Sequence, residues 1–333
     1  MKKILFVMAA LFGCFASSRA QSTLVATLSH GNDVSMYYGA YALRDALEKA
    51  ESGDIINLSD GAFQAADITK AITLRGAGID AAKPTYIVNQ FTINIPTDDG
   101  NRFTMEGIRC NDWLYLDGKF SDPCFVKCIL NGFDICWNYR DNDFIENVMF
   151  ANCKIIREYH IYHGTAQFVN CYLDKCINID SGSAATFLNC VMNQDYDIYA
   201  LSFSQLFNSI ICYKTDYVNT NVIPSSSTAS NCIAIGYNNP FEGLTSSPNC
   251  TVSTFAEVFK NYTGEYSDGQ TFELTDAAKA KFLGTDGTQV GVYGGVLPYT
   301  STPSYPQFTK MVVDGKTTTD GKLGVNIEVA AGK

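Results

Sequence analysis

Residues 150–190 read FANCKIIREYHIYHGTAQFVNCYLDKCINIDSGSAATFLNC, and one four-residue phrase occurs in them three times. Each copy consists of Phe, a spacer, Asn and Cys, and the copies begin at Phe150, Phe168 and Phe187. Weaker copies end at Cys128, Ser209 and Cys232. The last positions of the six copies are separated by 25, 18, 19, 19 and 23 residues. A recurrence in this range is typical of stacked supersecondary units and predicts a solenoid.

Between the copies, short runs alternate apolar and polar residues and are separated by Asn, Asp and Gly, a pattern typical of β-strands. Because no helical pattern separates them, successive parallel strands must stack coil on coil, about 4.8 Å apart. The repeated Asn is expected at a bend, since Asn tolerates left-handed backbone angles. Its amide is expected to bond to its counterparts on neighbouring coils as a ladder. The Phe and Cys of each copy are expected in the core, and Gly76 and Gly107 align with the cysteines.

The two ends of the stack have different patterns. Leu43, Ala46, Leu47 and Ala50 have the spacing i, i+3, i+4 and i+7, which predicts a short amphipathic helix that caps the first coil. Residues 299–306 are rich in Ser, Thr and Pro and read as a linker. Residues 310–313 and 323–329 are expected to pair as a β-hairpin that packs on the final coil. The expected organisation is therefore a signal peptide at 1–20, the solenoid with its cap at 21–298, and linker and hairpin at 299–333.

Residues 1–20 have the features of a cleaved signal peptide. Lys2 and Lys3 precede an apolar run, and Ser18 and Ala20 supply small residues before the cleavage point. This ordinary cleavage is favoured over a lipoprotein signal that ends at Cys14. The sequence thus predicts a protein that is secreted, or held at the cell surface or in the periplasm of a Gram-negative bacterium. No later segment is apolar enough to predict a membrane span.

Charge and cysteine content limit the partners. The formal net charge is −10, and removal of the three basic residues of residues 1–20 would make it −13. An acidic surface argues against a nucleic-acid partner. Eleven cysteines would remain, and their recurrence at one place in the repeat favours buried thiols over zinc ligands. The sequence leaves open whether one or two disulfides form among them.

The beginning, the middle and the end of the predicted solenoid resemble one family. Residues 42–47 (ALRDAL), 53–58 (GDIINL) and 74–78 (LRGAG) are similar to the opening of pectin-lyase-like β-helices, the Phe-x-Asn-Cys coils to their body, and residues 286–295 (DGTQVGVYGG) to their terminal coil. The chain resembles in particular exported β-helix proteins of anaerobic gut bacteria. The resemblance implies an all-β, right-handed parallel β-helix with a short N-terminal capping helix and C-terminal β-strands. It also implies a polysaccharide partner bound along one long face.

Candidate binding residues follow from the alternation of the strands. If Ile135, Ile161, Ile179 and Ile198 point into the core, the residues on either side of each point outward. Carboxylates, imidazole and phenols on such a face suit sugar hydroxyls and ring faces. One expected outward row is Asp134, His160, Asn178 and Asp197, and the other is Cys136, Tyr162, Asp180 and Tyr199. All of these except Cys136 are candidate substrate-binding residues, whereas Trp137 is expected in the core.

Catalytic residues are not assigned by the sequence. Asp180 and Asp197 on adjacent rungs would be about 5 Å apart, as a retaining glycosidase requires. The paired-aspartate, Gly-His-Gly and Arg-x-Pro-x-x-Arg motifs of family enzymes do not occur in the sequence. Candidates for lyase chemistry, on charge alone, are Arg140, Asp141 and Asp143 in the turn 138–143, and Lys154 with Arg157.

The favoured interpretation is therefore a polysaccharide-binding protein without turnover. A polysaccharide lyase or glycoside hydrolase acting on acidic glycans is one alternative, and a structural adhesin or surface assembly component is another. No cofactor is expected, although calcium is an option in a lyase because it would neutralise a substrate carboxylate.

Overall fold

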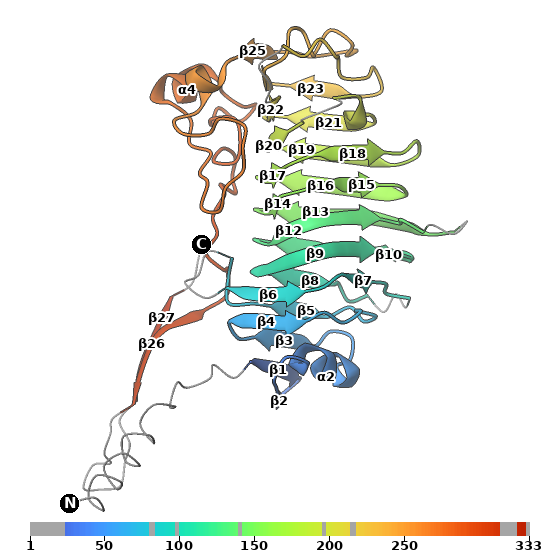
Figure 1. Cartoon of the computed structure of the whole chain (residues 1–333), viewed down its shortest axis with the longest axis vertical. Coiled ribbons are helices and arrows are strands. Elements are labelled where there is room, and N and C mark those ends of the chain that lie inside the picture. Colours follow the sequence, from blue (N-terminus) through green and yellow to red (C-terminus); the bar gives the residue numbers. More distant parts are fainter. Residues whose placement is uncertain are drawn as a thin grey trace, which may run out of the picture.

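The computed structural model describes residues 24–79, 84–96, 100–138, 142–194, 198–213, 218–313 and 325–330. These residues wind into a right-handed parallel β-solenoid of about nine turns (Figure 1). The predicted all-β fold class is confirmed, and so is the stacking of coil on coil. The predicted signal peptide, residues 1–20, lies outside the described residues.

The first sheet has twelve strands, and nine of its parallel strands represent successive turns of the solenoid. In spatial order they are β2 (Asp33–Tyr38), β1 (Val25–His30), β3 (Ile55–Leu58), β5 (Thr73–Arg75), β8 (Thr104–Glu106), β11 (Cys124–Val126), β13 (Phe144–Ala151), β16 (Gly164–Val169), β19 (Ala184–Leu188), β21 (Ser204–Phe207) and β23 (Thr228–Ser230), with β10 (Lys119–Ser121) beside β13.

The second sheet has thirteen strands and forms the other side of each turn. They are β25 (Thr251–Ser253), β24 (Ile233–Ile235), β22 (Ile210–Cys212), β20 (Val191–Asn193), β17 (Tyr172–Leu173), β14 (Lys154–Ile155), β12 (Ile129–Ile135), β9 (Ile108–Leu116), β6 (Thr85–Val88) and β4 (Gly61–Gln64), with β7 (Phe91–Ile93), β15 (Tyr159–Ile161) and β18 (Cys176–Ile179) beside them. The helices are α2 (Ala42–Lys49), α3 (Phe255–Val258), α4 (Asp276–Lys281) and the 3-10 helix η1 (Ile198–Leu201), and a separate hairpin contains β26 (Gln307–Val313) and β27 (Val325–Ala330).

The inner core is a ladder of identical side chains. Phe150, Phe168 and Phe187 occupy paired positions on β13, β16 and β19, and all three are fully buried. Neighbouring rings are 4.9 Å apart and nearly parallel, at 5° and 6°. The repeat cysteines are also fully buried, as the sequence predicts, namely Cys128, Cys153, Cys171, Cys190 and Cys232. All eleven cysteines of the described residues are free thiols.

The repeated Asn forms the corner between the two sheets. Its backbone is left-handed on every turn, with φ between 52° and 55° at Asn152, Asn170, Asn189, Asn208 and Asn231. The predicted bend is therefore confirmed. Earlier turns place Lys127 (φ 51°) and Gly107 (φ 69°) at the same corner. Because Glu106 pairs with Val126, the expected alignment of Gly107 with the cysteines is wrong by one residue.

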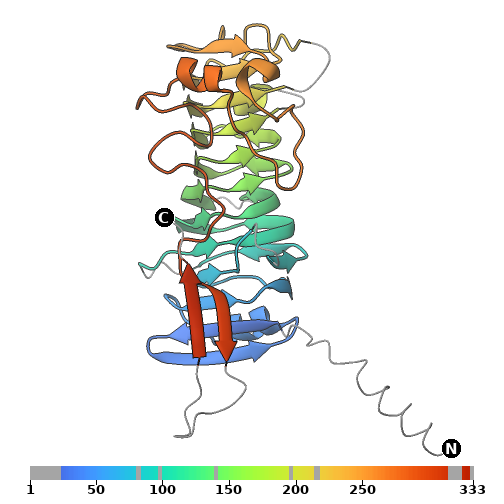
Figure 2. The same cartoon turned by 90° about the vertical axis from the view of Figure 1, so that its left-hand side faces the viewer.

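The predicted ladder of Asn amides forms only in part. Asn208 donates to Asn189 at 3.1 Å, but most corner amides bond to residues 283–305, which we call the strap. Asn170 donates to the carbonyls of Val292 and Gly294 at 2.9 and 2.8 Å. Figure 2 shows the strap running along the stack past many turns. The corner residues therefore hold a distant segment as well as each other.

A second apolar core lies outside the solenoid, under residues 255–299. Tyr172, Val191 and Ile210 point outward from the second sheet and are fully buried by this segment. Tyr262 and Phe272 pack against them, with the ring of Phe272 stacked 4.6 Å from that of Tyr172. The outer side of these strands is thus covered.

The strap continues to the opposite end of the solenoid. Thr300 donates its backbone N–H to Asn152 at 2.6 Å, and Ser304 donates to Glu106 at 2.7 Å. Tyr305 donates to the carbonyl of Gly76. Residues 299–306, expected as a linker, are therefore bonded to the coils. The hairpin of β26 and β27 is present, but it begins beside the N-terminal coils and not at the final coil, where packing was expected (Figure 1).

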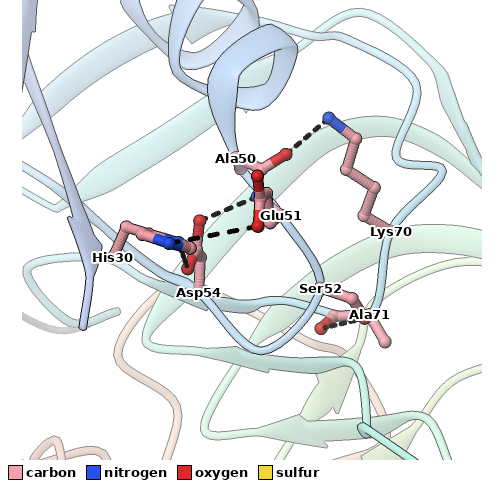
Figure 3. Close-up of polar contacts among 7 residues, drawn as sticks. All are labelled: His30, Ala50, Glu51, Ser52, Asp54, Lys70 and Ala71. Carbon is pink, nitrogen blue, oxygen red and sulfur yellow. Dashed lines mark hydrogen bonds and ion pairs between the residues drawn. The ribbon is translucent and has the colours of Figure 1, made fainter. Parts of the chain in front are cut away.

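The N-terminal helix α2 caps the first coil as predicted, with Leu43, Ala46 and Leu47 buried. Polar contacts join the end of this helix to Lys70 and hold the turn that follows the helix (Figure 3). Lys70 donates to the carbonyls of Leu47 and Ala50 at 3.1 and 2.5 Å, and so satisfies the end of the helix.

The turn after this helix is held by Asp54. This side chain accepts the backbone N–H of Glu51 at 2.7 Å and contacts Nδ1 of His30 at 2.8 Å. The hydrogen bond to Asp54 and the negative charges of Asp54 and Glu51 raise the pKa of His30. The His30 cluster is therefore part of the cap.

Two variants of Asn170 separate the roles of its backbone and its side chain. We expect Asn170→Gly to keep the left-handed corner but to lose two buried hydrogen bonds to the strap, which lowers the free energy of unfolding by about 1–3 kcal/mol. Asn170→Ala adds the left-handed backbone cost, about 1–2 kcal/mol more. Urea denaturation of the full chain measures both values.

Asn147→Gly is the matched control, because Asn147 also has a left-handed backbone (φ 56°) but an exposed side chain. We expect it to change stability by less than about 0.5 kcal/mol. If Asn170→Gly is as stable as the original protein, the strap bonds do not contribute.

Candidate functional site

One outer region of the second sheet carries polar and aromatic residues on consecutive rungs. The rungs are the ends of β9, β12, β15 and β18, where Leu116, Ile135, Ile161 and Ile179 are paired in register and buried. Ile198 is also buried but lies in η1, so the fourth expected strand is a 3-10 helix. The inward direction of all four predicted isoleucines is confirmed. Their neighbours in sequence form two outward columns.

The first column contains Tyr115, Asp134, His160 and Asn178, which pair rung by rung. Asp134 is almost fully buried, and its Oδ1 lies 2.5 Å from Nδ1 of His160. Because an ionised carboxylate can only accept, Nδ1–H of His160 is the donor. Nε2 of this ring makes no hydrogen bond with the described residues. Within the described residues, the second ring nitrogen thus has no hydrogen-bond partner.

The second column contains Asp117, Tyr162 and Asp180. Backbone hydrogen bonds between successive rungs hold these residues in register. Tyr162 donates its N–H to Ile135 at 3.0 Å, and Asp180 donates to Ile161 at 2.9 Å. The amide of Asn178 donates to the carboxylate of Asp180. This bond joins the two columns at the β18 rung.

Two expectations for the β12 rung are wrong. Cys136, expected outward, is fully buried with its Sγ 3.8 Å from the carbonyl of Gly118, because its backbone is left-handed (φ 58°) and ends the alternation. Trp137, expected in the core, is consequently turned outward and is 49% exposed. The indole ring meets the ring of Tyr162 edge-on, at 5.5 Å.

Asp117 fixes the turn that presents this indole. Its carboxylate accepts hydrogen bonds from the backbone of Trp137 and Asn138. Burial and the negative charges of Asp143 and Asp134 raise the pKa of Asp117, against the effect of these backbone bonds. Asp117 therefore positions Trp137.

Aromatic rings continue along both columns. The rings of His160 and Tyr162 are stacked at 5.3 Å and 22°, and Trp113 lies 6.2 Å from His160. Gly132 makes room for Trp113, because a Cβ at this position would lie 2.5 Å from the indole ring. A side chain at position 132 would displace the indole.

We call this region the aromatic–acidic face, and its residues come from four rungs. It comprises Trp113, Tyr115, Asp117, Asp134, Trp137, His160, Tyr162, Asn178 and Asp180. Five predicted binding residues meet there, namely Asp134, His160, Tyr162, Asn178 and Asp180. Asp197 lies outside the described residues, and Tyr199 lies in η1, with its side chain outside them.

Sequence reasoning missed Trp113, Tyr115, Asp117 and Trp137. Tyr115 and Asp117 flank Leu116 as Asp134 and Cys136 flank Ile135, so the alternation extended by one rung would have found them. No comparable signal marks Trp137.

The phenols of the face are hydrogen-bond donors at neutral pH. Burial and the charges of Asp134 and Asp180 raise the pKa of Tyr162 to about 12. Burial and the charges of Asp134, Asp112 and Asp117 raise that of Tyr115. Neither hydroxyl makes a hydrogen bond with the described residues. Within the described residues, both O–H groups are therefore without an acceptor.

The basic residues proposed for a lyase do not join the face. Lys154 is buried beneath the rings of Tyr266 and Tyr299, at 5.9 and 5.4 Å, under the C-terminal segment. Arg157 is exposed at the turn before β15, and Arg140 lies outside the described residues. The face is thus dominated by carboxylates and aromatic rings.

Two hollows of the surface have walls that contain none of the nine residues of the face. One of about 500 Å³ lies nearby, with Lys119, Phe144 and Glu146 in its wall, and another of about 360 Å³ lies beside α2. Among the described residues, no three or more His, Cys, Asp or Glu side chains are grouped to hold a metal ion. None of the described helices is long and apolar enough to cross a bilayer.

We compared the chain with known proteins at the levels of family, sequence and structure. No protein-family model, curated protein or solved structure matches it. The function must therefore be argued from the fold and from the chemistry of the aromatic–acidic face.

Proposed function

We propose that the protein is an exported, pectin-lyase-like β-helix that binds polysaccharide along the aromatic–acidic face. The observation that carries the proposal is the register of this face. Aromatic rings, carboxylates and two phenol hydroxyls recur on consecutive rungs of one open surface. Parallel β-solenoids are common among polysaccharide-processing and surface proteins, which agrees with this function.

The chemistry of the face suits a sugar. An indole or phenol ring packs against the apolar face of a pyranose, and its polar atom bonds to a hydroxyl. Trp137 offers such a ring, because half of its surface is exposed and its orientation is fixed by Tyr162 and Asp117. Acceptors are supplied by Asp180 and Asp134, and donors by the phenols. A sugar needs both kinds of group.

The shape of the face suits a polymer. Rungs of a solenoid repeat about every 4.8 Å, so similar groups are offered at regular steps along the axis. The signal-peptide features of residues 1–20 support export of the protein, and export would bring it into contact with extracellular glycans.

Trp137→Ala tests the proposed platform. We expect retention on an immobilised glycan to fall at least tenfold, because aromatic anchors of an interface contribute about 2 kcal/mol or more. Affinity electrophoresis against a panel of polysaccharides measures retention, and thermal melting checks that the variant is folded.

The matched control is Tyr38→Ala, which removes an aromatic side chain that is 61% exposed on β2, outside the face. Its retention should equal that of the original protein. Equal loss in both variants, or none in Trp137→Ala, would place the glycan site elsewhere.

One observation favours a catalytic alternative. The pair of His160 and buried Asp134 is an arrangement that fixes a histidine tautomer and supports general base catalysis. With Nε2 of His160 unbonded within the described residues, this nitrogen could remove a proton from a sugar or from water. The alternative function is therefore a polysaccharide lyase or glycoside hydrolase in which His160 is the base.

Turnover assays decide on this alternative. If the protein is a lyase or hydrolase, we expect unsaturated products or new reducing ends from at least one polysaccharide, and His160→Gln should lower the rate by about 10²–10⁴-fold. Asp134→Asn should lower it less, because Asp134 acts through His160. An absence of products over the whole panel, with binding retained, leaves the binding function.

A further inference from the structure

We propose that the aromatic–acidic face selects sugars that carry a positive charge, so that its ligand is an amino-sugar polymer and not a polyuronate. This inference rests on the proposed saccharide-binding function and names the substrate class of the same site. It differs from the acidic glycan of the lyase or hydrolase alternative that the sequence leaves open.

The charges on the face have one sign. The ionised groups that act on Tyr162 are Asp134 and Asp180, and those that act on Tyr115 are again aspartates, all of which raise the pKa values of the phenols. Asp117 is affected in the same direction by Asp143 and Asp134. His160 is the one titratable nitrogen of the face, and its Nδ1 is held by Asp134. A carboxylate on the sugar would therefore be repelled.

Two basic side chains of the described rungs lie at the opposite ends of their strands. Arg157 and Lys175 precede β15 and β18, whereas Asp180 follows the last residue of β18. Lys119 lies in the wall of the neighbouring hollow, with Glu146 in the same wall. None of the nine residues that define the face is Lys or Arg.

Three oligomers of equal length test the inference by isothermal titration calorimetry with the full chain. They are the glucosamine oligomer, its N-acetylated form, which has the same ring without the charge, and the galacturonate oligomer with and without calcium. We expect the glucosamine oligomer to bind at least about tenfold more tightly than the N-acetylated one, because a hydrogen bond between charged groups adds about 1.5–3 kcal/mol. Added salt should reduce this difference.

Asp180→Asn tests whether the negative charge of Asp180 causes the preference for the charged sugar. We expect it to weaken glucosamine binding about tenfold and binding of the N-acetylated oligomer much less, so that the ratio of the two affinities falls. Glu242→Gln removes a negative charge from an exposed loop residue outside the face and should change neither value. Melting temperatures of both variants check the fold.

The outcomes separate this inference from the proposed function. Binding of the N-acetylated oligomer as tight as that of the glucosamine oligomer would overturn the selectivity and keep saccharide binding. Tighter binding of galacturonate, with calcium or without it, would also overturn the inference but keep the function. If none of the three binds, both fail.

Discussion

The left-handed corner between the two sheets is the constraint on which the rest of the structure depends. From Lys127 to Asn231, each turn changes sheet at one residue with φ near 53°, and Asn supplies that conformation at small steric cost. Because the corner recurs at the same place, Val169 pairs with Leu188 and Phe168 stacks on Phe187. The same register carries around each turn to the rungs where His160 lies beside Asp134 and Asn178. The candidate site is thus a consequence of the corner.

The corner also decides which part of the outer surface stays open. The amides of Asn152 and Asn170 bind the strap, and residues 255–299 cover the outward side chains of the strands beside it. Those side chains are apolar, such as Tyr172 and Val191. The side chains that point outward farther along the same turns are polar, as at His160, and no part of the strap bonds to them. The outward side chains of the covered strip are therefore mainly apolar, with buried Lys154 as an exception, whereas the face combines polar groups with aromatic rings.

The sequence was sufficient for the elements that repeat and insufficient for those that occur once. The Phe-x-Asn-Cys phrase and the alternation of strands predicted the core, the bends and five residues of the face, because each copy supports the register of the next. Cys136 and Trp137 were misplaced because one left-handed residue inverts the alternation without a signal in a single copy. The end of the strap, from residue 299, was predicted as a linker, since its partners, such as Glu106, lie far away in sequence. Long-range contacts of a segment without periodicity leave no local pattern.

The rigidity of the rungs bears on binding strength as well as on fold. Every rung of the face is tied to the next by backbone hydrogen bonds, as at Tyr162 and Asp180, so its side chains are held before a ligand arrives. Preorganisation lowers the entropy that a binding site loses when it closes on a ligand. Contacts on one rung can then be weak, because a polymer that reaches several rungs adds them with little further cost. A short oligosaccharide gains less from the same face, so affinity should rise steeply with the number of sugar units that the rungs can contact.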